Sequence, residues 1–322
     1  MAQQLDFDLD ADDYRRRFAR IRESNLLQDD LYGQTMARIQ GLQARWGLIR
    51  DGGRELGVVQ VLERHALSGL LGAVVLDRGP LWLPGIDGAA HAGEFFSAFS
   101  RIWPRRIGRR RRIVPELPAG DASLALLRNA GCHRKGGEEA ATYATFVVPV
   151  SDEASARRQL LPRWRHALDR AATAMADGRL VLHWPNALAR VPELVRKHLA
   201  QRESRGYRGP AAAELQRLLL DYAKAGKLLI GEARAAGDEA PCSMVAMLCH
   251  GTTATYQIAW NDESGRRLHA NNALLWSALG QLRERDITCL DLGGHDARHT
   301  PLLRRYKAGL GGREIVLAPM HD

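Results

Sequence analysis

The stretch of this sequence with the most chemistry in it is CLDLGGHDARHTPLLRRYKAGLGG, residues 289–312. An acidic residue, Asp291, lies in its apolar run, His295 and His299 follow four residues apart, and Lys307 stands between two glycine-rich spots. Glycines beside a lysine can form a loop that holds phosphate, and a histidine pair can contribute to a metal site. Each alternative would imply a different class of enzyme.

The order of the residues excludes a phosphate-binding P-loop. That loop requires GxxxxGK[ST] between a strand and a helix, with the lysine after the glycines. Here Lys307 comes before its glycines, at the end of the helical pattern PLLRRYKAG, so we expect Gly309, Gly311 and Gly312 to terminate a helix. The histidine pair has no third ligand and no evident helix, so we expect no metal.

Composition and charge limit the class of protein. The chain has 322 residues, 45% of them hydrophobic and 26% charged, which is enough for one large domain or two ordinary ones. No apolar run approaches the roughly 20 residues that span a bilayer. The first residues are acidic where a signal peptide would be basic, and four scattered cysteines are expected to be reduced thiols, so we expect a cytoplasmic protein. The net charge of +9 suits an anionic ligand, although an arginine-rich composition alone would also produce it.

Strand and helix patterns occur twice in the same order. The first set is 46–51, 56–64, 71–79, a helix 92–103, a strand 111–117, a helix 123–131 and a strand 142–150. The second is 227–235, 242–250, 253–261, a helix 270–285, a strand 287–293, a helix 301–309 and a strand 313–319. Each set follows a helical region, 12–45 or 188–225.

This order is that of the GNAT acyltransferase fold, so the pattern predicts an α/β (α+β) chain with two tandem GNAT-like domains. We expect the domains at 1–150 and 151–312, with a terminal strand in 313–322 that packs on either one.

Several stretches in register resemble the Fem-type (FemABX-like) peptidoglycan-bridge aminoacyltransferases, which have two GNAT-like domains. They are NLLQDDLYGQ (25–34), VLDRGPLWLPG (75–85), LPRWRHALDRAATAM (161–175), ATYQIAW (254–260), RRLHANNALLWSAL (266–279), LDLGG (290–294) and RRYKAGLGG (304–312). The last departs from the family pattern, because Arg304-Arg305-Tyr306 replaces a Gly-Ile…Phe run and Leu310 replaces a second Phe. These departures bear on the shape of the pocket beside Lys307.

The resemblance implies transfer of an acyl group to an amine, classically an aminoacyl group from charged tRNA to a peptidoglycan precursor. It places Lys307 at the family's functional lysine, where the cation would stabilise an oxyanion or a phosphate. The alternative is a helix-terminal lysine favoured by the macrodipole. In a GNAT fold the strand that ends at Asp291 opens the cleft, so Asp291 would orient the amine or act as a base, or else cap the loop that follows.

The remaining candidate residues would bind substrate. Arg165 matches a helix arginine that the resemblance associates with an anionic substrate. Tyr256 and Trp260 would share one face of a strand by its period of two, although aromatic strand residues also serve as core. The other candidates lie in the two loops of the cleft: Arg267, Asn271, Gly293, Gly294 and His295.

The donor is left open between charged tRNA and an acyl thioester, with no resident cofactor expected. Acetyl-CoA enzymes of the fold carry Q/R-x-x-G-x-G/A before the helix, where backbone N–H groups hold the pyrophosphate. In RRLHANN (266–272), Ala270 and Asn272 replace the glycine positions, which favours a donor other than plain CoA.

Two other functions remain as alternatives. One is an N-acyltransferase that uses acyl-CoA or an acyl-carrier protein on a lipid or small-molecule amine. The other is a non-catalytic double-GNAT scaffold that binds RNA. The basic stretch RRIGRRRR (105–112) would attract an RNA backbone or would simply be a solvated turn.

Overall fold

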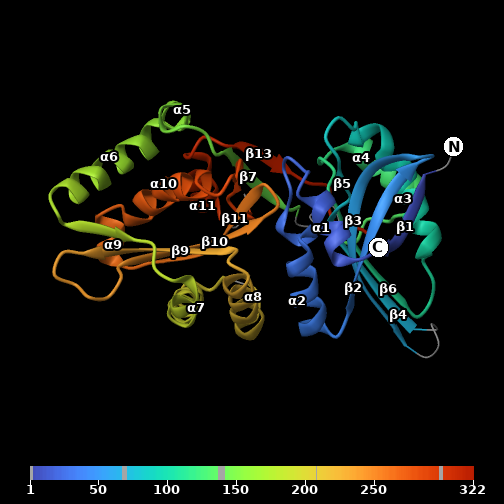
Figure 1. Ribbon diagram of the computed structural model, residues 1–322, viewed down its shortest axis with the longest axis horizontal. Helices are drawn as coiled ribbons and strands as arrows, with labels where there is room; N and C mark the ends of the chain where they lie inside the picture. Colours follow the sequence, from blue (N-terminus) through green and yellow to red (C-terminus); the bar gives the residue numbers. More distant parts are fainter. Residues whose placement is uncertain (1–2, 67–70, 137–141, 208, 297–299) are drawn as a thin grey trace. The chain divides into compact units, whose positions relative to one another are not determined.

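The computed structural model describes residues 3–66, 71–136, 142–207, 209–296 and 300–322. The chain divides into two compact units (Figure 1). The first consists of residues 1–144 and 315–322, and the second of residues 145–314. Each unit contains one sheet with helices on both faces. The described residues include no helix long and apolar enough to cross a membrane.

The sheet of the first unit has the order β1-β2-β3-β4-β6, with β5 beside β3. Its strands are β1 (Gln4–Leu9), β2 (Gln43–Asp51), β3 (Arg54–Ala66), β4 (Leu71–Gly79), β5 (Leu81–Trp82) and β6 (Arg109–Pro115). Strands β1 to β4 pair antiparallel, and β6 runs parallel to β4. The helices are α1 (Ala11–Phe18), the 3₁₀ helix η1 (Leu26–Gln28), α2 (Asp30–Gln40), α3 (Gly88–Ile102) and α4 (Asp121–Asn129).

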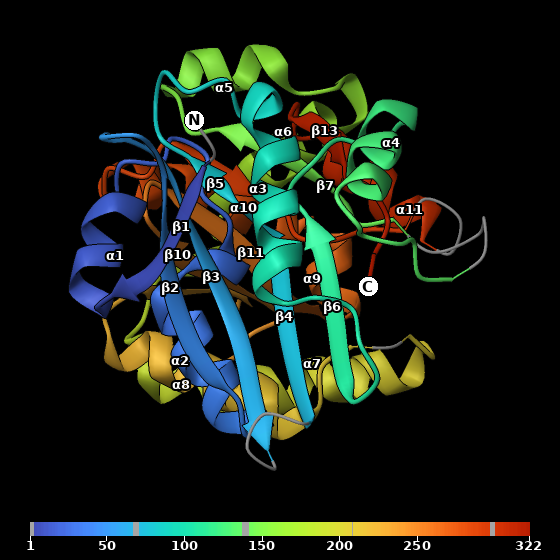
Figure 2. The same ribbon diagram turned by 90° about the vertical axis from the view of Figure 1, so that its right-hand side faces the viewer.

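Alternation along the strands gives this sheet an apolar surface on each face. Ile49 and Val59 pack with the α3 phenylalanines, and α3 lies across that face (Figure 2). Their neighbours Leu48 and Val58 point the other way and pack with the aromatic residues of α1. The period of two therefore fixes which helix covers which face.

Two of the stretches that carry the family resemblance bind each other inside the first unit. The Gln28 amide donates to the carbonyls of Gln60 (3.1 Å) and Asp77 (2.8 Å), and its oxygen accepts from the Gln60 N–H (2.7 Å). Asn25 donates to the carbonyl of Arg78 (2.7 Å). At this level β3 pairs with β5 instead of β4, so the Gln28 side chain supplies hydrogen bonds that a neighbouring strand would otherwise make. LLQ and RGP are thus structural here.

The sheet of the second unit has the order β13-β7-β12-β11-β10-β9-β8. Its strands are β7 (Ala144–Pro149), β8 (Leu180–His183), β9 (Leu228–Ala235), β10 (Ser243–His250), β11 (Thr253–Asn261), β12 (Cys289–Asp291) and β13 (Arg313–Val316). The helices are α5 (Glu153–Gln159), α6 (Pro162–Ala176), α7 (Ala187–Ser204), α8 (Ala212–Lys224), α9 (Glu263–Arg267), α10 (Ala270–Arg283) and α11 (Pro301–Ala308). Helices α6 and α10 lie on one face of the sheet, and α7 and α8 on the other (Figure 1).

The position of β7 differs from the sequence-based expectation. We expected the strand in residues 142–150 to close the sheet of the first repeat, but β7 lies in the second sheet, antiparallel to β12 with Val148 opposite Leu290. Its residues Ala144–Val148 are all buried, as in a strand covered on both faces. Such a run carries no alternation that could assign it to one sheet or the other.

Replacing Gln28 with alanine tests the structural role of the LLQ stretch. Gln28→Ala leaves three buried backbone groups of β3 and β4 without their partner, and each costs about 1–3 kcal/mol. We therefore expect urea denaturation to show a loss of about 3 kcal/mol or more in the free energy of unfolding. The matched control is Gln40→Ala, at an exposed position, for which we expect a change within about 0.5 kcal/mol. Equal stability of the two variants would contradict this role.

Candidate active site

Lys307 is a buried lysine of α11 whose ammonium lies beside the loop that follows β12, so it is not a solvated lysine at a helix end. It lies in the last turn of α11 and is 5% exposed. Its Nζ donates to the carbonyls of Gly293 (2.8 Å) and Gly294 (2.9 Å). Burial lowers its pKa from 10.5 to about 8, and the nearby carboxylate of Asp291 opposes that shift. An ammonium has three N–H donors, so these two bonds leave one.

The helix that carries Lys307 ends where the sequence predicted, but Gly309 does not provide the left-handed residue that usually terminates a helix. Helix α11 ends at Ala308, and Gly309 has a right-handed φ of −62°. A Cβ on Gly309 would lie 2.5 Å from Cδ1 of Trp164 in α6, so this glycine permits close helix packing. The left-handed position is Gly311, whose φ is +90°. The chain therefore turns two residues later than the simplest capping pattern predicts.

Asp291 positions the loop to which Lys307 binds. It is 2% exposed, and its Oδ1 accepts from the Gly293 N–H (2.8 Å) and lies 2.5 Å from the Thr145 hydroxyl. Sequence analysis did not identify Thr145, because it belongs to β7, the strand expected in the other repeat. The Asp291 carboxylate thus has partners from both β7 and the glycine loop.

Strands β11 and β12 separate beside Lys307. Their parallel pairing runs from Thr253↔Cys289 to Thr255↔Asp291, where β12 ends, while β11 continues to Asn261. Gly293 follows with a φ of +73°, and a Cβ there would lie 2.8 Å from the carbonyl oxygen of Tyr256. Only glycine meets both demands, so LDLGG is required by the backbone that presents carbonyls to Lys307.

Two tyrosines, Tyr256 of β11 and Tyr306 of α11, are joined through the side-chain amide of Asn271 in α10, and we call these two residues the tyrosine pair. Asn271 Nδ2 lies 2.7 Å from the Tyr306 hydroxyl and 3.3 Å from the Tyr256 hydroxyl. Burial raises the pKa of Tyr256 to about 12 and that of Tyr306 well above 10. Both phenols are therefore neutral at pH 7 and can act as hydrogen-bond donors. Tyr306 was not predicted as a site residue, although its departure from the family's Phe marked the position.

Tyr256 and Trp260 do not share a face of β11, which corrects the expectation from the period of two. The register against β10 passes from Ala246↔Ile258 to Met247↔Tyr256, so Gln257 is an extra, bulged residue. Tyr256 contacts Asn271 of α10. Trp260 instead lies under the Lys197 ammonium of α7, which is 3.8 Å from its ring centroid. The bulge reverses the alternation between the two aromatic residues.

His295 is buried beside the glycine loop. Its ring stacks on Phe146 at 5.2 Å, and its Nε2 lies 3.2 Å from Glu314, a carboxylate that Arg304 binds through two nitrogens. Burial lowers the pKa of His295 more than Glu314 raises it, so the ring is neutral at pH 7. Its side chain is fully buried, which gives it a packing role beside Lys307.

The two candidate arginines lie apart from this cluster. Arg165, on α6, donates to the carbonyl of Leu160 (3.1 Å), and its Nε has no hydrogen-bond partner among the described residues. Arg267 is exposed on α9, where it binds Glu263 (3.0 Å) and Ser264 (2.9 Å). Of the predicted residues, Lys307, Asp291, Gly293 and Gly294 are thus in direct contact, with the Tyr256 carbonyl against Gly293.

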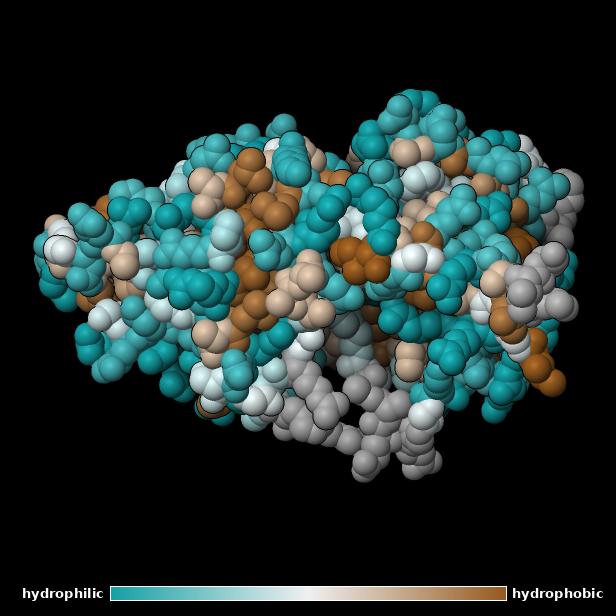
Figure 3. All heavy atoms as spheres, turned by 90° about the horizontal axis from the view of Figure 1, so that it is seen from below, coloured by the Kyte–Doolittle hydropathy of each residue, from teal (hydrophilic) through white to brown (hydrophobic). Residues whose placement is uncertain are grey.

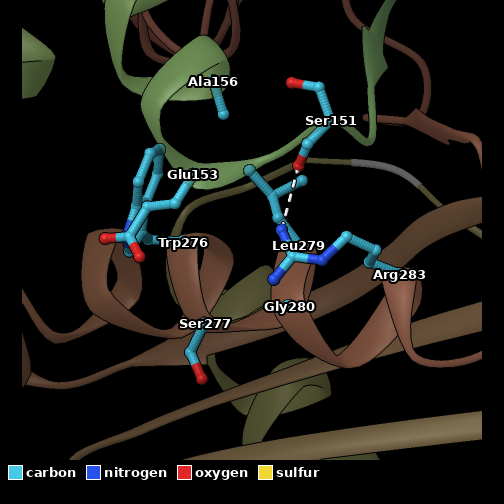
Figure 4. Close-up of a pocket in the computed structure, with 8 residues that line it drawn as sticks. All are labelled: Ser151, Glu153, Ala156, Trp276, Ser277, Leu279, Gly280 and Arg283. Atoms are coloured by element: carbon cyan, nitrogen blue, oxygen red, sulfur yellow. Dashed lines mark hydrogen bonds between the residues drawn. The ribbon is translucent and has the colours of Figure 1, made fainter.

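Two cavities of the second unit differ in what they could hold. A small one of about 150 Å³ between α5 and α10 is shown in Figure 4, where Arg283 donates to the Ser151 carbonyl. It is below the size of ordinary ligand sites. The other, about 600 Å³, lies between α7 and the end of β11, and its lining includes the Trp260 indole, four cations and two carboxylates: Arg196, Lys197, Arg205, Arg266, Asp262 and Glu263. Seen from below, the molecule presents hydrophilic side chains around hydrophobic patches (Figure 3).

The described residues contain no cluster of three or more His, Cys, Asp or Glu side chains placed to hold a metal. His299, the second histidine of the pair considered from sequence, lies outside the described residues. His295 faces Glu314 and Phe146, so it is already engaged in packing.

Comparisons with known proteins agree with this architecture. The family of acetyltransferase (GNAT) domains matches residues 154–308, which is most of the second unit. A crystal structure of FemX is similar over 100% of this chain and 97% of that one, with 12% identity and a TM-score of 0.78. A conserved protein of unknown function from Bacteroides thetaiotaomicron covers 98% of this chain and 97% of its own, with 13% identity and a TM-score of 0.54. No curated protein sequence matches the chain.

The sheet order, the separation of β11 from β12 and the matched domain lead to one conclusion. The chain has a double GNAT-like fold similar to that of FemX, and its residues 154–308 match the acetyltransferase (GNAT) domain family.

Proposed function

We propose that the chain transfers an aminoacyl group from charged tRNA to the amine of an anionic acceptor, such as a peptidoglycan precursor or a peptide. The amine nitrogen would attack the ester carbonyl, a C–N bond would form, and the negative charge would develop on the carbonyl oxygen. The ester C–O bond would then break, and the amine proton would pass to the departing ribose hydroxyl. No covalent enzyme intermediate is needed.

The observation that carries this proposal is the buried ammonium of Lys307. Two of its N–H groups are held by the carbonyls of Gly293 and Gly294, and the third would donate to the developing oxyanion. In a site shielded from water, a fixed positive charge acts strongly on charge that appears only in the transition state. Asp291 would act as a positioning residue, since its oxygen already binds the Gly293 N–H and Thr145.

The start of α10 supports a donor other than plain CoA. In acetyl-CoA enzymes of this fold, backbone N–H groups at this helix start hold the pyrophosphate. Here Ala270 is fully buried and Asn272 is 8% exposed, so the first turn of α10 is closed off by side chains. The segment before it contains α9 in place of a glycine loop.

The 600 Å³ cavity supports a nucleic-acid donor. Four cations line it, Arg196, Lys197, Arg205 and Arg266, together with the carboxylates of Asp262 and Glu263 and the Trp260 indole, one face of which the Lys197 ammonium covers. Cations that follow a phosphate backbone and an aromatic ring on which a base stacks are the usual elements of single-stranded nucleic-acid binding. The 3′ end of a charged tRNA is single-stranded.

The acetyltransferase description of the matched domain favours one other candidate function, an N-acyltransferase that uses acyl-CoA or an acyl-carrier protein. The two functions are separated by the donor. Purified protein is incubated with charged tRNAs, acyl-CoAs and acyl-carrier proteins in parallel, with peptidoglycan precursors, peptides and small amines as acceptors, and products are read by mass shift. We expect product with charged tRNA. Product with a thioester alone would establish the other donor.

Replacing Lys307 tests the transfer site directly. Loss of one oxyanion donor typically costs about 10²–10³-fold in kcat, so we expect Lys307→Ala to lose at least that much while circular dichroism stays native. The matched control is Lys224→Ala, an exposed lysine that also lies in the last turn of its helix. Wild-type turnover in Lys307→Ala would reduce Lys307 to a lysine that only stabilises its helix.

The pH dependence tests the charge on Lys307. Because burial lowers its pKa to about 8, the ammonium is present below that pH and is lost above it. We expect kcat/KM to fall as the pH rises through about 8, apart from any rise at lower pH as the acceptor amine deprotonates. Lys307→Arg retains its charge throughout this range, so its slower reaction should lack the falling limb. A falling limb in that variant would assign it to another group.

Neutralising the 600 Å³ cavity tests the donor surface. We expect Arg196→Gln combined with Arg205→Gln to weaken tRNA binding and to flatten its salt dependence, by about 0.7 per lost phosphate contact in log K against log salt. Arg170→Gln combined with Arg179→Gln, at exposed positions outside the cavity, is the control. Equal effects from the two pairs would indicate a general charge effect and no groove.

A further inference from the structure

The first unit contains a cavity that the transfer reaction does not use. It has a volume of about 640 Å³ and lies at the start of β6. Its lining consists of Arg105, Arg106, Ile107, Arg109, Arg110, Arg111, Lys135 and Asp322. Six cationic residues and one acidic residue thus line the cavity. All of these residues belong to the first unit, whereas Lys307 and its partners belong to the second.

Arg111 is the most informative of these residues. It is 4% exposed, and among the described residues its Nη2 donates to the Ser100 hydroxyl (3.3 Å) and the Cys132 sulfur (3.5 Å), while the guanidinium lies 5.9 Å from the centroid of the Phe99 ring. Its Nε has no hydrogen-bond partner among the described residues. A buried cation without a carboxylate is costly, and an anion in the cavity would remove that cost.

Two neighbouring arginines, Arg105 and Arg109, have their carboxylate partners, Asp322 and Glu63, only at a distance. Arg105 approaches Asp322 only to 3.7 Å. Arg109 donates to the Pro104 carbonyl (3.1 Å), and burial together with the positive charges of Arg106 and Arg111 lowers its pKa. Mutual repulsion therefore acts inside the cluster. The alternative considered from sequence, a plain solvated turn, explains why Arg110 is exposed, but it does not explain why Arg111 is buried.

We propose that this cavity binds the diphosphate or polyphosphate group of a small ligand. Arginine forks bind phosphate oxygens in pairs, and a diphosphate or longer chain brings several negative charges into a space of this size. The volume lies in the range of small-molecule sites. The lining has no aromatic residue on which a base would stack, unlike the Trp260 cavity, so the observations favour a compact polyanion over an RNA strand.

Calorimetric titration of the full chain tests this site, with inorganic pyrophosphate and tripolyphosphate as probes and orthophosphate and sulfate as comparison anions. We expect pyrophosphate to bind at least about tenfold more tightly than orthophosphate, because two phosphates reach more arginines. Nucleoside diphosphates form a further arm. Tighter binding of these than of pyrophosphate identifies an esterified ligand, and the reverse order identifies a free polyphosphate.

The variant pair is Arg105→Gln with Arg106→Gln, two exposed residues of the lining whose loss should leave the fold intact. We expect it to weaken pyrophosphate binding about tenfold or more, since each charge-assisted contact is strong. The control pair is Arg54→Gln with Arg128→Gln, exposed arginines of the same unit outside the cavity. Equal losses in both pairs, equal affinity for sulfate and pyrophosphate, or displacement of pyrophosphate by an RNA duplex at lower phosphate concentration would each overturn the proposal. None of these readouts depends on acyl transfer.

Discussion

The second unit is organised around one buried charge, the Lys307 ammonium held by two glycine carbonyls. Removing an ion from water is expensive, and these two bonds compensate for only part of the cost, as the lowered pKa of about 8 records. The arrangement requires β12 to end early, Gly293 to adopt a left-handed φ, and α11 to approach α6 closely at Gly309. The glycines that resembled a phosphate-binding loop in the sequence therefore allow the backbone and helix packing that bury the Lys307 ammonium.

Local patterns in the sequence, such as periodicity and the glycines, predicted the repeated strands and helices and the helix that ends after Lys307. The choice of Lys307 as a functional residue came from the family resemblance, and the structure places its ammonium in contact with Gly293 and Gly294. Two features could not be found in that way. The β7 run is apolar throughout, so it carries no mark of its sheet, and its Thr145 was missed with it. The bulge at Gln257 has no local signal either, and one extra residue was enough to place Trp260 with α7.

The tyrosine pair places two phenol hydroxyls beside the Asn271 amide, which the family pattern alone does not imply. Tyr306 stands where relatives carry Phe, and its hydroxyl is bound to the same Asn271 amide that contacts Tyr256. Because burial raises the pKa of both phenols, they remain neutral donors and cannot act as bases near pH 7. The residue next to Lys307 in sequence thus contributes a hydroxyl to this cluster.

The sequence stretches that carry the family resemblance have different roles in the two units. In the first, LLQ and RGP make hydrogen bonds that join β3, β4 and η1, and they leave no reactive group free for chemistry. In the second, LDLGG and RRYKAGLGG assemble a charged site. The same division holds for the basic surfaces. The second unit pairs its cations with an indole, whereas the first gathers arginines around a buried one that has only neutral contacts. The arrangement of charge therefore differs between two units of similar fold, although both are rich in arginine and lysine.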